Sequence, residues 1–494
     1  PPGTPGAEEG PGRARESTRE DAAPELHAIL AAWDARTARV EVEASVALPG
    51  PPFLGEGKPE NQNVALPFAH GEKLQVIDMN QEGYLEEALK MRCLLREFDV
   101  RVPGRPPRTI VGFTEHIFTA ASGFVTAIYM ALQERYFCTF HQRVCEVPLD
   151  VRQHYGHPDL LDKAHFMGRG GISRPSKEIN LNEDVFAAYN TTLRSGSVIF
   201  REYTAVGKGR MTNLTEIFFF EVKLAQGAAE QCMSRDVLRL CRAMPLVRLM
   251  SFYYSGLGFY IHQVLVMRAT LMIGYLVSLL TLVRLDSAVL PGAAGVLGFT
   301  TLFPLCVTLA TIVPAGTMVG AEKGVRAAFA YAYKIVATLA PLYFLFITQG
   351  RAHYFARTVR HGGAKYFVSK RTVSTGHVPL HEAYATYAQS HLYPAVDILV
   401  ILAVGATHAH HTDFGALTWM IWFIAASWVV TPFLYNVQAV ETATVLADAR
   451  ALARWLGAPP REDATPFDSW ATWWAEQHLQ RTQAGWAAPA FMSV

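Results

Sequence analysis

Acidic, basic and glycine residues occur together in seven short stretches between residues 54 and 236. Asp, Asn and Gly gather there at the ends of expected strands, where a turn of the backbone exposes polar side chains to a cleft. Carboxylates at a cleft can exchange protons, and Lys or Arg can neutralise a bound anion. Each stretch alone is a weak indication, because a Lys beside a Glu is usually part of a solvated loop. The stretches are LGEGKPENQN at 54–63, QVIDMNQEGYLEEALKMR at 75–92, HYGHPD at 154–159, GRGGIS at 168–173, INLNEDVFAAYNTTLRSG at 179–196, VGKGR at 206–210 and EVKLAQGAAEQCMSRD at 221–236.

Several common kinds of site are excluded. The chain has no Gly-x-x-x-x-Gly-Lys-Ser/Thr loop, no Gly-x-Gly-x-x-Gly after a strand, no Gly-x-Ser-x-Gly elbow and no Asp-x-Asp. Six cysteines without a Cys-x-x-Cys spacing exclude a disulfide scaffold and a zinc ribbon. The net charge of +1 provides no cationic field for a nucleic acid. His408, His410 and His411 could bind a metal, but a solvated turn is the better interpretation because they lie between two apolar segments.

The elements that must position these stretches form a soluble α/β region at 48–247. A helix is predicted at Tyr84–Phe98, with Asn80 as its N-cap. Alternation of strands and helices predicts a sheet layered with helices. Residues 1–47 are expected to be a flexible or partial N-terminal segment, because the first 24 are rich in Pro, Gly and charge. Strands are predicted at 74–79, 108–113, 197–206 and 216–223, where β-branched and aromatic residues dominate.

Apolar segments dominate the chain after Leu249. A bilayer core needs about 20 apolar residues per helix, and soluble helices rarely sustain such runs. We therefore predict four to five membrane segments, with a single charge, Arg268, in the first. They are 249–283, 287–321, 328–350, 414–440 and the shorter 398–411.

The basic connection that begins at Arg351 is expected in the cytoplasm, on the same side as the soluble region, by the positive-inside rule. Three full crossings between the two would place them on opposite sides. Segment 328–350, which contains Lys334 and Pro341, is therefore expected to lie in the interface or to re-enter the membrane.

Together, the ordered stretches resemble the 1,3-β-glucan synthases, a family that includes plant callose synthases and fungal glucan synthase catalytic subunits (glycosyltransferase family 48). The similarity extends from about Leu48 to Gln480 and includes HGGAKY at 361–366 and SWATWW at 469–474. The plant and algal branch fits better than the fungal one. Family members carry a long soluble segment and a first membrane bundle before the LGEGK stretch, so this chain is expected to be an N-terminally truncated member.

The resemblance implies transfer of glucose from UDP-glucose to a growing 1,3-linked chain, with inversion, and movement of that chain across the plasma membrane. The expected fold class is α/β, with a partial GT-A-like glycosyltransferase domain at 48–247. An α-helical multi-span membrane region follows at 248–440, with a basic cytoplasmic loop at 351–392, and a cytoplasmic tail at 441–494. The implied partners are UDP-glucose, the glucan chain, membrane lipids and a regulatory GTPase or other synthase subunits.

Inverting transfer needs a carboxylate that accepts the proton of the acceptor hydroxyl, and positive charge that neutralises the departing diphosphate. The resemblance assigns the first role to Glu183, with Asp184 second. It makes Lys58 and Lys223 contacts of the diphosphate or sugar, and Asp78 a ligand of the donor or of Mg²⁺, the one cofactor such a site could use. No metal ligands are otherwise assigned. Further substrate-binding candidates are Asn61, Arg169, Lys208, Arg210, Glu230, Gln231 and Arg235.

Two other functions fit the same sequence. The chain could be a polysaccharide or lipid transporter whose cytoplasmic block only gates the pore, with Arg268 and Lys334 lining a polar path. It could also be a non-catalytic scaffold fragment of the synthase complex. Binding of UDP-glucose by the soluble block would distinguish a synthase from a pure transporter.

Overall fold

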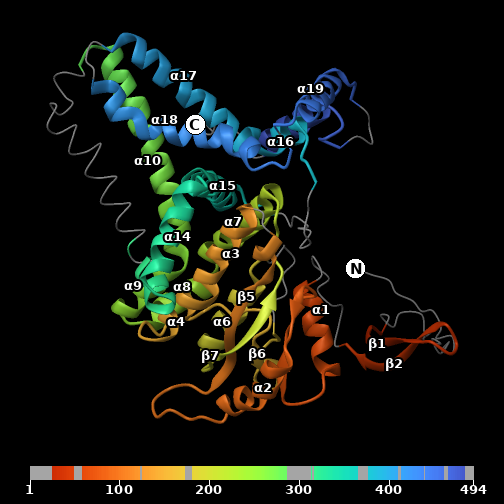
Figure 1. Cartoon of the computed structure of the whole chain (residues 1–494). Coiled ribbons are helices and arrows are strands. Elements are labelled where there is room, and N and C mark those ends of the chain that lie inside the picture. Colours follow the sequence, from red (N-terminus) through yellow and green to blue (C-terminus); the bar gives the residue numbers. More distant parts are fainter. Residues whose placement is uncertain are drawn as a thin grey trace, which may run out of the picture.

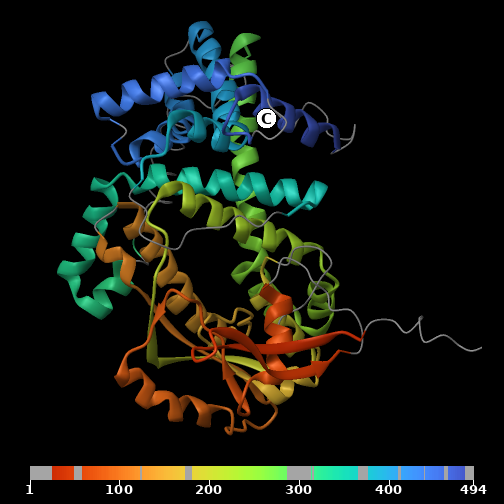
Figure 2. The same cartoon turned by 90° about the vertical axis from the view of Figure 1, so that its right-hand side faces the viewer.

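An α/β block and a set of long apolar helices make up the computed structural model (Figure 1). The block holds the N-terminal half of the chain, and the helices after residue 256 lie mostly to one side of it (Figures 1 and 2). The structure describes residues 25–48, 58–122, 125–172, 181–285, 313, 316–364, 376–409, 413–438, 440–460 and 465–483.

A five-stranded mixed sheet forms the centre of the block. Its two long strands, β5 and β7, are parallel, and every other pairing is antiparallel. The predicted strands at 108–113 and 197–206 are confirmed as β5 and β7, whereas only the start of the predicted strand at 74–79 is extended. In spatial order the strands are β3 (Lys73–Gln75), β6 (Leu160–Asp162), β5 (Arg108–Ile117), β7 (Ser197–Lys208) and β4 (Gln81–Glu82).

Both faces of the sheet are buried, because neighbouring residues on each strand point to opposite sides. Ile110 packs with residues of helices α5 (Lys163–Met167) and α6 (Glu183–Leu193) on one side. Val111 packs with Leu94 and Phe98 of the α2 region on the other side.

Helix α2 (Leu85–Glu97) confirms the predicted helix. The predicted cap is wrong, because Tyr84 occupies the N-cap position. The Asn80 side chain instead donates a hydrogen bond to the backbone oxygen of Gly209. Asn80 lies four residues before the N-cap position, so its side-chain oxygen does not cap the first turn of α2.

The predicted strand at 216–223 is wrong, since these residues belong to helix α7 (Leu214–Met233). Asn213 caps this helix by accepting a hydrogen bond from the Thr215 backbone N–H at 2.8 Å. The aromatic run favours a strand locally, but Phe218 is fully buried between helices, and that burial overrides the local preference.

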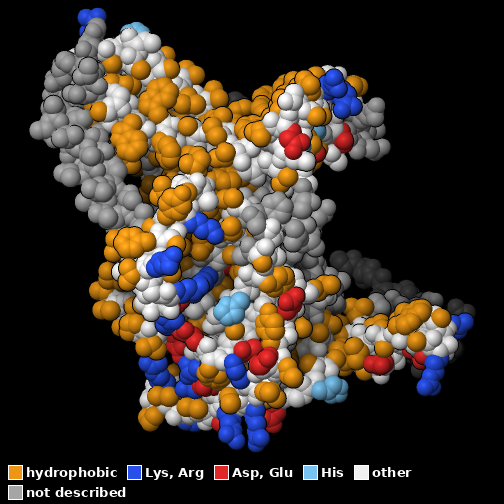
Figure 3. Space-filling view, viewed as in Figure 1, with side chains coloured by type: hydrophobic (Ala, Val, Ile, Leu, Met, Phe, Trp, Pro, Cys, Tyr) orange, Lys and Arg blue, Asp and Glu red, His pale blue; other side chains and the backbone are white. Residues whose placement is uncertain are grey.

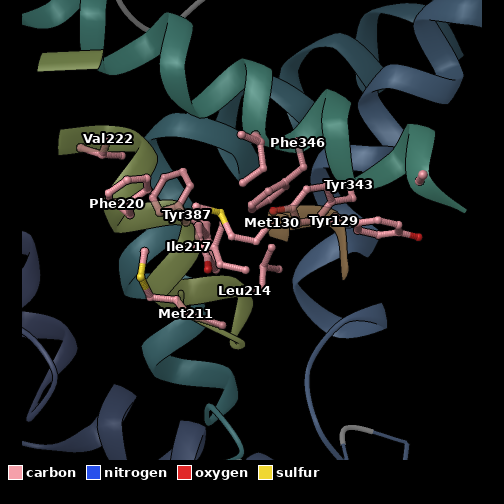
Figure 4. Close-up of a cluster of buried hydrophobic side chains, with 14 residues drawn as sticks. Tyr129, Met130, Met211, Leu214, Ile217, Phe220, Val222, Tyr343, Phe346 and Tyr387 are labelled. Carbon is pink, nitrogen blue, oxygen red and sulfur yellow. The ribbon is translucent and has the colours of Figure 1, made fainter. Parts of the chain in front are cut away.

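The core around α7 joins the α/β block to the apolar helices (Figure 4). Ile217 and Phe218 of α7 pack there against Tyr343 and Phe346 of α15 (Ala340–His361), and Tyr387 of α16 (Leu380–Tyr387) completes the contact. The remaining helices of the block are α1 (Lys58–Ala65), α3 (Val125–Arg135), α4 (Gln142–Glu146), α8 (Arg235–Ala243) and α9 (Leu246–Ser255), together with the π-helical turn η4 (Tyr136–His141).

A two-stranded hairpin precedes the block within the segment 1–47. Strands β1 (His27–Asp34) and β2 (Arg39–Ala47) pair antiparallel, and Trp33 is 64% exposed. The sequence predicts a flexible or partial segment here and no strand.

Three helices are long and apolar enough to cross a membrane: α10 (Leu257–Leu282), the run Leu380–His408 that ends in α17 (Tyr393–His408), and Phe414–Leu434 within α18 (Asp413–Leu434). Predicted segments 249–283 and 414–440 correspond to the first and the last. Residues 398–408 of the predicted segment 398–411 belong to a longer helical run, whereas most of 287–321 lies outside the described residues. Hydrophobic side chains cover the outside of these helices, and charged side chains gather on the α/β block (Figure 3).

A fourth apolar unit is bent. Helices α14 (Val325–Ala337) and α15 meet at 68°, and Leu339 at the bend has a left-handed backbone with φ of 56°. This geometry suits a broken span or a re-entrant segment, as the sequence predicts for 328–350.

The expected basic loop at 351–392 is largely helical in the described residues. Arg351 lies inside α15 and is buried, where its Nε donates to Glu221 Oε2 at 2.6 Å. Arg351 is therefore part of a buried helix and not of the expected loop, because it pairs with an acid that lies 130 residues earlier in the sequence. At the end of the chain, α19 (Thr442–Gly457) and α20 (Trp470–Gln483) pack on this region through Trp455 and Trp473.

Candidate active site

A buried lysine at the end of β7 is the centre of the site. The Lys208 ammonium lies 3.1 Å from Glu115 of β5 and 3.3 Å from Asp78. It also donates to the backbone oxygen of His157 at 3.1 Å. The side chains of Lys208 and Glu115 are only 5% and 4% exposed. Parallel pairing of β5 and β7 places Glu115 and Lys208 near the same end of the sheet, which is where α/β proteins bind ligands.

The loop that carries Asp78 is tied to two other polar stretches. The Asp78 backbone N–H donates to Gln81 Oε1 at 2.8 Å, and Gln81 Nε2 donates to the His157 backbone oxygen. Asn80 exchanges two hydrogen bonds with Gly209, one of them from the Gly209 N–H at 2.9 Å. The IDMNQ, HYGHPD and GKGR stretches, far apart in sequence, therefore form one unit.

A second buried ion pair lies beside the first. Arg210 Nε donates to Glu134 Oε2 at 2.8 Å, and the Cys138 sulfur lies 3.7 Å from Glu115 and 3.8 Å from Glu134. Burial raises the pKa of the Cys138 thiol, and the two carboxylates raise it further. Burial alone would lower the pKa of Arg210, but Glu134 and Glu115 outweigh it and raise that pKa. Cys138 is therefore a neutral thiol and Arg210 a permanent cation.

A fully buried ion pair stabilises the HYGHPD loop. Arg152 donates to Asp159 at 3.1 Å, and the Gly156 backbone N–H donates to the same carboxylate oxygen at 2.8 Å. A Cβ on Gly156 would lie 2.8 Å from a Glu115 carboxylate oxygen. Glycine at this position therefore allows the loop to approach Glu115 closely.

Helix α1 places the ENQN stretch against two loops. Gln62 Nε2 lies 3.3 Å from His157 Nε2. Gly171, in the GRGGIS stretch, has a φ of 90°, and a Cβ there would lie 2.2 Å from the Asn63 side-chain oxygen. Only glycine accommodates both this backbone conformation and this contact.

The LNED stretch begins helix α6, so both acids lie in its first turn. A helix N-terminus stabilises negative charge there. Glu183 is 3% exposed. Asp184 lies 3.1 Å from His154 Nε2, which links LNED to the HYGHPD loop.

Helix α7 packs directly against this turn. The Leu181 backbone N–H donates to Glu230 at 3.3 Å, and a Cβ on Gly227 would lie within 2.4 Å of the Asn182 side chain. Gln231 accepts a hydrogen bond from the Tyr189 hydroxyl at 3.4 Å. The LNED and GAAEQ stretches are thus in contact.

The structure brings together several of the predicted site residues. Asp78 contacts Lys208, and Arg210 lies in the adjoining ion pair. Glu230 contacts Leu181 just before α6, and Gln231 contacts Tyr189 within α6. Lys223 is half-buried on α7. Three candidates, Asn61, Arg169 and Arg235, are exposed, and the side chain of Lys58 lies outside the described part of the structure.

Sequence reasoning missed Glu115 and Glu134. Both are buried acids, and their partners Lys208 and Arg210 lie 93 and 76 residues away. The available signal was Glu115 itself, a carboxylate within the apolar strand sequence TIVGFTEHI, because buried acids are rarely left without a cation.

Mg²⁺ does not fit the clustered acids. Among the described residues, the only group of three possible metal ligands is Glu115, Glu134 and Cys138. Both carboxylates already pair with cations, and the third group is a thiol, whereas Mg²⁺ prefers oxygen ligands in an octahedron. We therefore derive no step through a metal.

Comparison with known proteins gives a consistent result. The family model of the 1,3-beta-glucan synthase component matches residues 14–488. Callose synthase 7 of Arabidopsis thaliana is 39% identical over 452 residues, which cover 88% of this chain and 23% of that protein. Callose synthase 9 is 39% identical over 462 residues (91% and 24%), and callose synthase 12 is 38% identical over 471 residues (93% and 26%), both from the same plant. The chain therefore spans about a quarter of the length of these relatives, and it belongs to the 1,3-β-glucan synthase family.

Proposed function

We propose that this chain provides catalytic machinery and membrane helices of a 1,3-β-glucan synthase. In this proposal it transfers glucose from UDP-glucose, with inversion, to a growing 1,3-linked chain. The observation that carries the proposal is the convergence of the IDMNQ, HYGHPD and GKGR stretches on one buried charge cluster, in a chain that is 39% identical to callose synthase 7.

In this proposal the acids accept the proton and bind the donor, and the lysines neutralise the diphosphate. Glu183 is the base or the group that orients the acceptor hydroxyl, with Asp184 as the second candidate. Glu183 lies buried in the first turn of α6, and a base of this kind accepts the proton of the acceptor hydroxyl. Asp78 binds the donor, and Lys58 and Lys223 neutralise the diphosphate as it departs.

The membrane half is proposed to carry the product across the plasma membrane, with the α/β block in the cytoplasm. In the described helices, a cavity of about 20 Å³ is lined by Arg268, Gln349, His353 and Gln389. It has room for about one water molecule, so this cavity is too small to hold a sugar chain. A regulatory GTPase or further synthase subunits are partners that this proposal allows.

The direct test replaces the proposed base. Glu183→Gln, in the chain or within a longer synthase polypeptide that contains it, should abolish incorporation of UDP-glucose into alkali-insoluble glucan at an unchanged protein level. The matched control is Asp236→Asn, which removes an acid from the first turn of α8 and should leave incorporation near normal. Near-normal polymer from Glu183→Gln would remove Glu183 from catalysis.

UDP binding separates the alternatives. A synthase should show UDP-dependent protection of the α/β block from proteolysis, whereas a pure transporter should show none. A non-catalytic scaffold fragment would make no polymer alone but would support synthesis when the remainder of a longer synthase polypeptide is supplied.

A further inference from the structure

Lys208 already has a full set of partners inside the protein. Its ammonium faces two carboxylates and one backbone oxygen within 3.3 Å, from Glu115, Asp78 and His157. An ammonium has three hydrogens to donate. A lysine held in this way is poorly suited to contact a substrate directly, although the sequence makes it a substrate-binding candidate.

Glu115 is the more deeply buried of the two acids. Its carboxylate side chain is 4% exposed, and that of Asp78 is 13% exposed. Gly156 leaves the space that the Glu115 carboxylate occupies. Glu115 therefore has a fixed position at the end of β5, while Asp78 lies on a loop between short strands.

We propose that Glu115 is a positioning residue, whose carboxylate fixes the Lys208 ammonium so that this ammonium orients the Asp78 carboxylate at the donor site. Lys208 then acts on the donor through Asp78. The part concerning the donor rests on the proposed function, whereas the control of the Asp78 loop by Glu115 does not.

Loss of the Glu115 charge should loosen the Asp78 loop. In Glu115→Gln, the ammonium keeps one carboxylate instead of two and moves toward Asp78, which disturbs the hydrogen bond between the Asp78 N–H and Gln81. We expect amide hydrogen exchange in residues 76–82 to accelerate about tenfold. The matched control is Glu146→Gln, because Glu146 also pairs with a cation of β7, Arg201, at 2.9 Å. That control should leave exchange at 76–82 unchanged.

A double-variant cycle tests whether the effect passes through Lys208. UDP binding to the full chain in detergent is measured by calorimetry for the parent, Glu115→Gln, Lys208→Met and the combined variant. We expect each single change to weaken UDP binding about tenfold, and the combined variant to be no weaker than Lys208→Met alone. A purely structural role for Glu115 would instead give additive losses.

The outcomes separate the two proposals. If the parent does not bind UDP, the proposed function fails, and hydrogen exchange at 76–82 still decides the role of Glu115. Unchanged exchange in Glu115→Gln, or additive losses in the cycle, would overturn the positioning role. If Glu115→Gln does not fold, the combined variant replaces it. In the combined variant the buried ammonium of Lys208 is also removed, so no buried charge lacks a partner acid. Its exchange at 76–82 should still exceed that of Glu146→Gln, and equal exchange in the two would reject the role.

Discussion

The ion pair between Glu221 and Arg351 links the α/β block to the apolar helices, and breaking it should be costly. Glu221 is on α7 and Arg351 is on α15, with 2.6 Å between the paired atoms and side chains only 2% and 8% exposed. Glu221→Gln would leave the Arg351 guanidinium buried without a carboxylate. Removal of one partner from a buried pair costs about 3–5 kcal/mol. Arg351 also lies 5.5 Å above the ring of Phe259, which offsets only a small part of this cost.

Thermal unfolding of the detergent-solubilised chain, followed by tryptophan fluorescence, measures this effect. At about 2 °C or more per kcal/mol for a unit of about 200 residues, Glu221→Gln should lower the unfolding midpoint by roughly 6 °C or more. The double variant Glu221→Leu with Arg351→Met should recover most of the loss, because apolar residues of similar size can replace a buried pair. Glu202→Gln breaks the exposed pair with Arg143 and should cost less than about 1 kcal/mol.

The reasoning would be refuted if Glu221→Gln had the midpoint of the parent. It would equally be refuted if the apolar double variant were as unstable as the two single variants combined. Either result would mean that the pair is hydrated or does not form, and that α7 and α15 are held together by their apolar contacts alone.

Three further predictions concern the α/β block. Gly171→Ala should destabilise it by more than about 1 kcal/mol in urea unfolding, because φ is 90° and the new Cβ would lie 2.2 Å from a side-chain oxygen of α1; an unchanged midpoint would contradict this. N-ethylmaleimide should label the exposed Cys93 at least about tenfold faster than the buried Cys138 in the native chain, read by peptide mass spectrometry, because the raised pKa suppresses the Cys138 thiolate. Partial burial would raise the pKa of Asp162, but Lys73 lowers it on balance, so the pair stabilises the fold above about pH 4 and less as the pH falls below that. Lys73→Met should therefore cost about 0.5–1 kcal/mol at pH 7 and much less at pH 2.5, and an equal cost at both would refute the assignment.

The sequence predicted correctly those strands and helices whose local pattern of apolar residues matches their burial in the fold. Strand β5 (108–117) and strand β7 (197–208) are rich in β-branched and apolar residues, and most of these residues are buried. Helix α2 follows from its helical spacing of apolar residues, of which Leu94 is fully buried. The aromatic run of α7 predicts a strand, whereas it forms a helix. The residues that pack against it come from α15 and α16, which lie more than 100 residues further along the chain.

In the candidate site, too, single residues could be predicted from local sequence, but contacts between distant residues could not. Asp78 and Lys208 could be named from polar stretches at strand ends, but their contact could not, because 130 residues separate them in the sequence. The cation partners of Glu115 and Glu134 could not be named for the same reason. Pairing of buried charges depends on the register of β5 against β7, which no local pattern encodes.

Helix α7 belongs at once to the site and to the core that holds the apolar helices. Lys223, Glu230 and Gln231 lie on the same helix whose residues Ile217 and Phe218 pack against α15. Protein interiors are close-packed, so a shift of α15 that separates it from Phe218 must either move α7 or open a cavity. The Glu230 hydrogen bond to Leu181 ties the other end of α7 to the segment just before α6. The α/β block and the apolar helices are accordingly joined along α7 by side-chain packing and not only by the peptide chain.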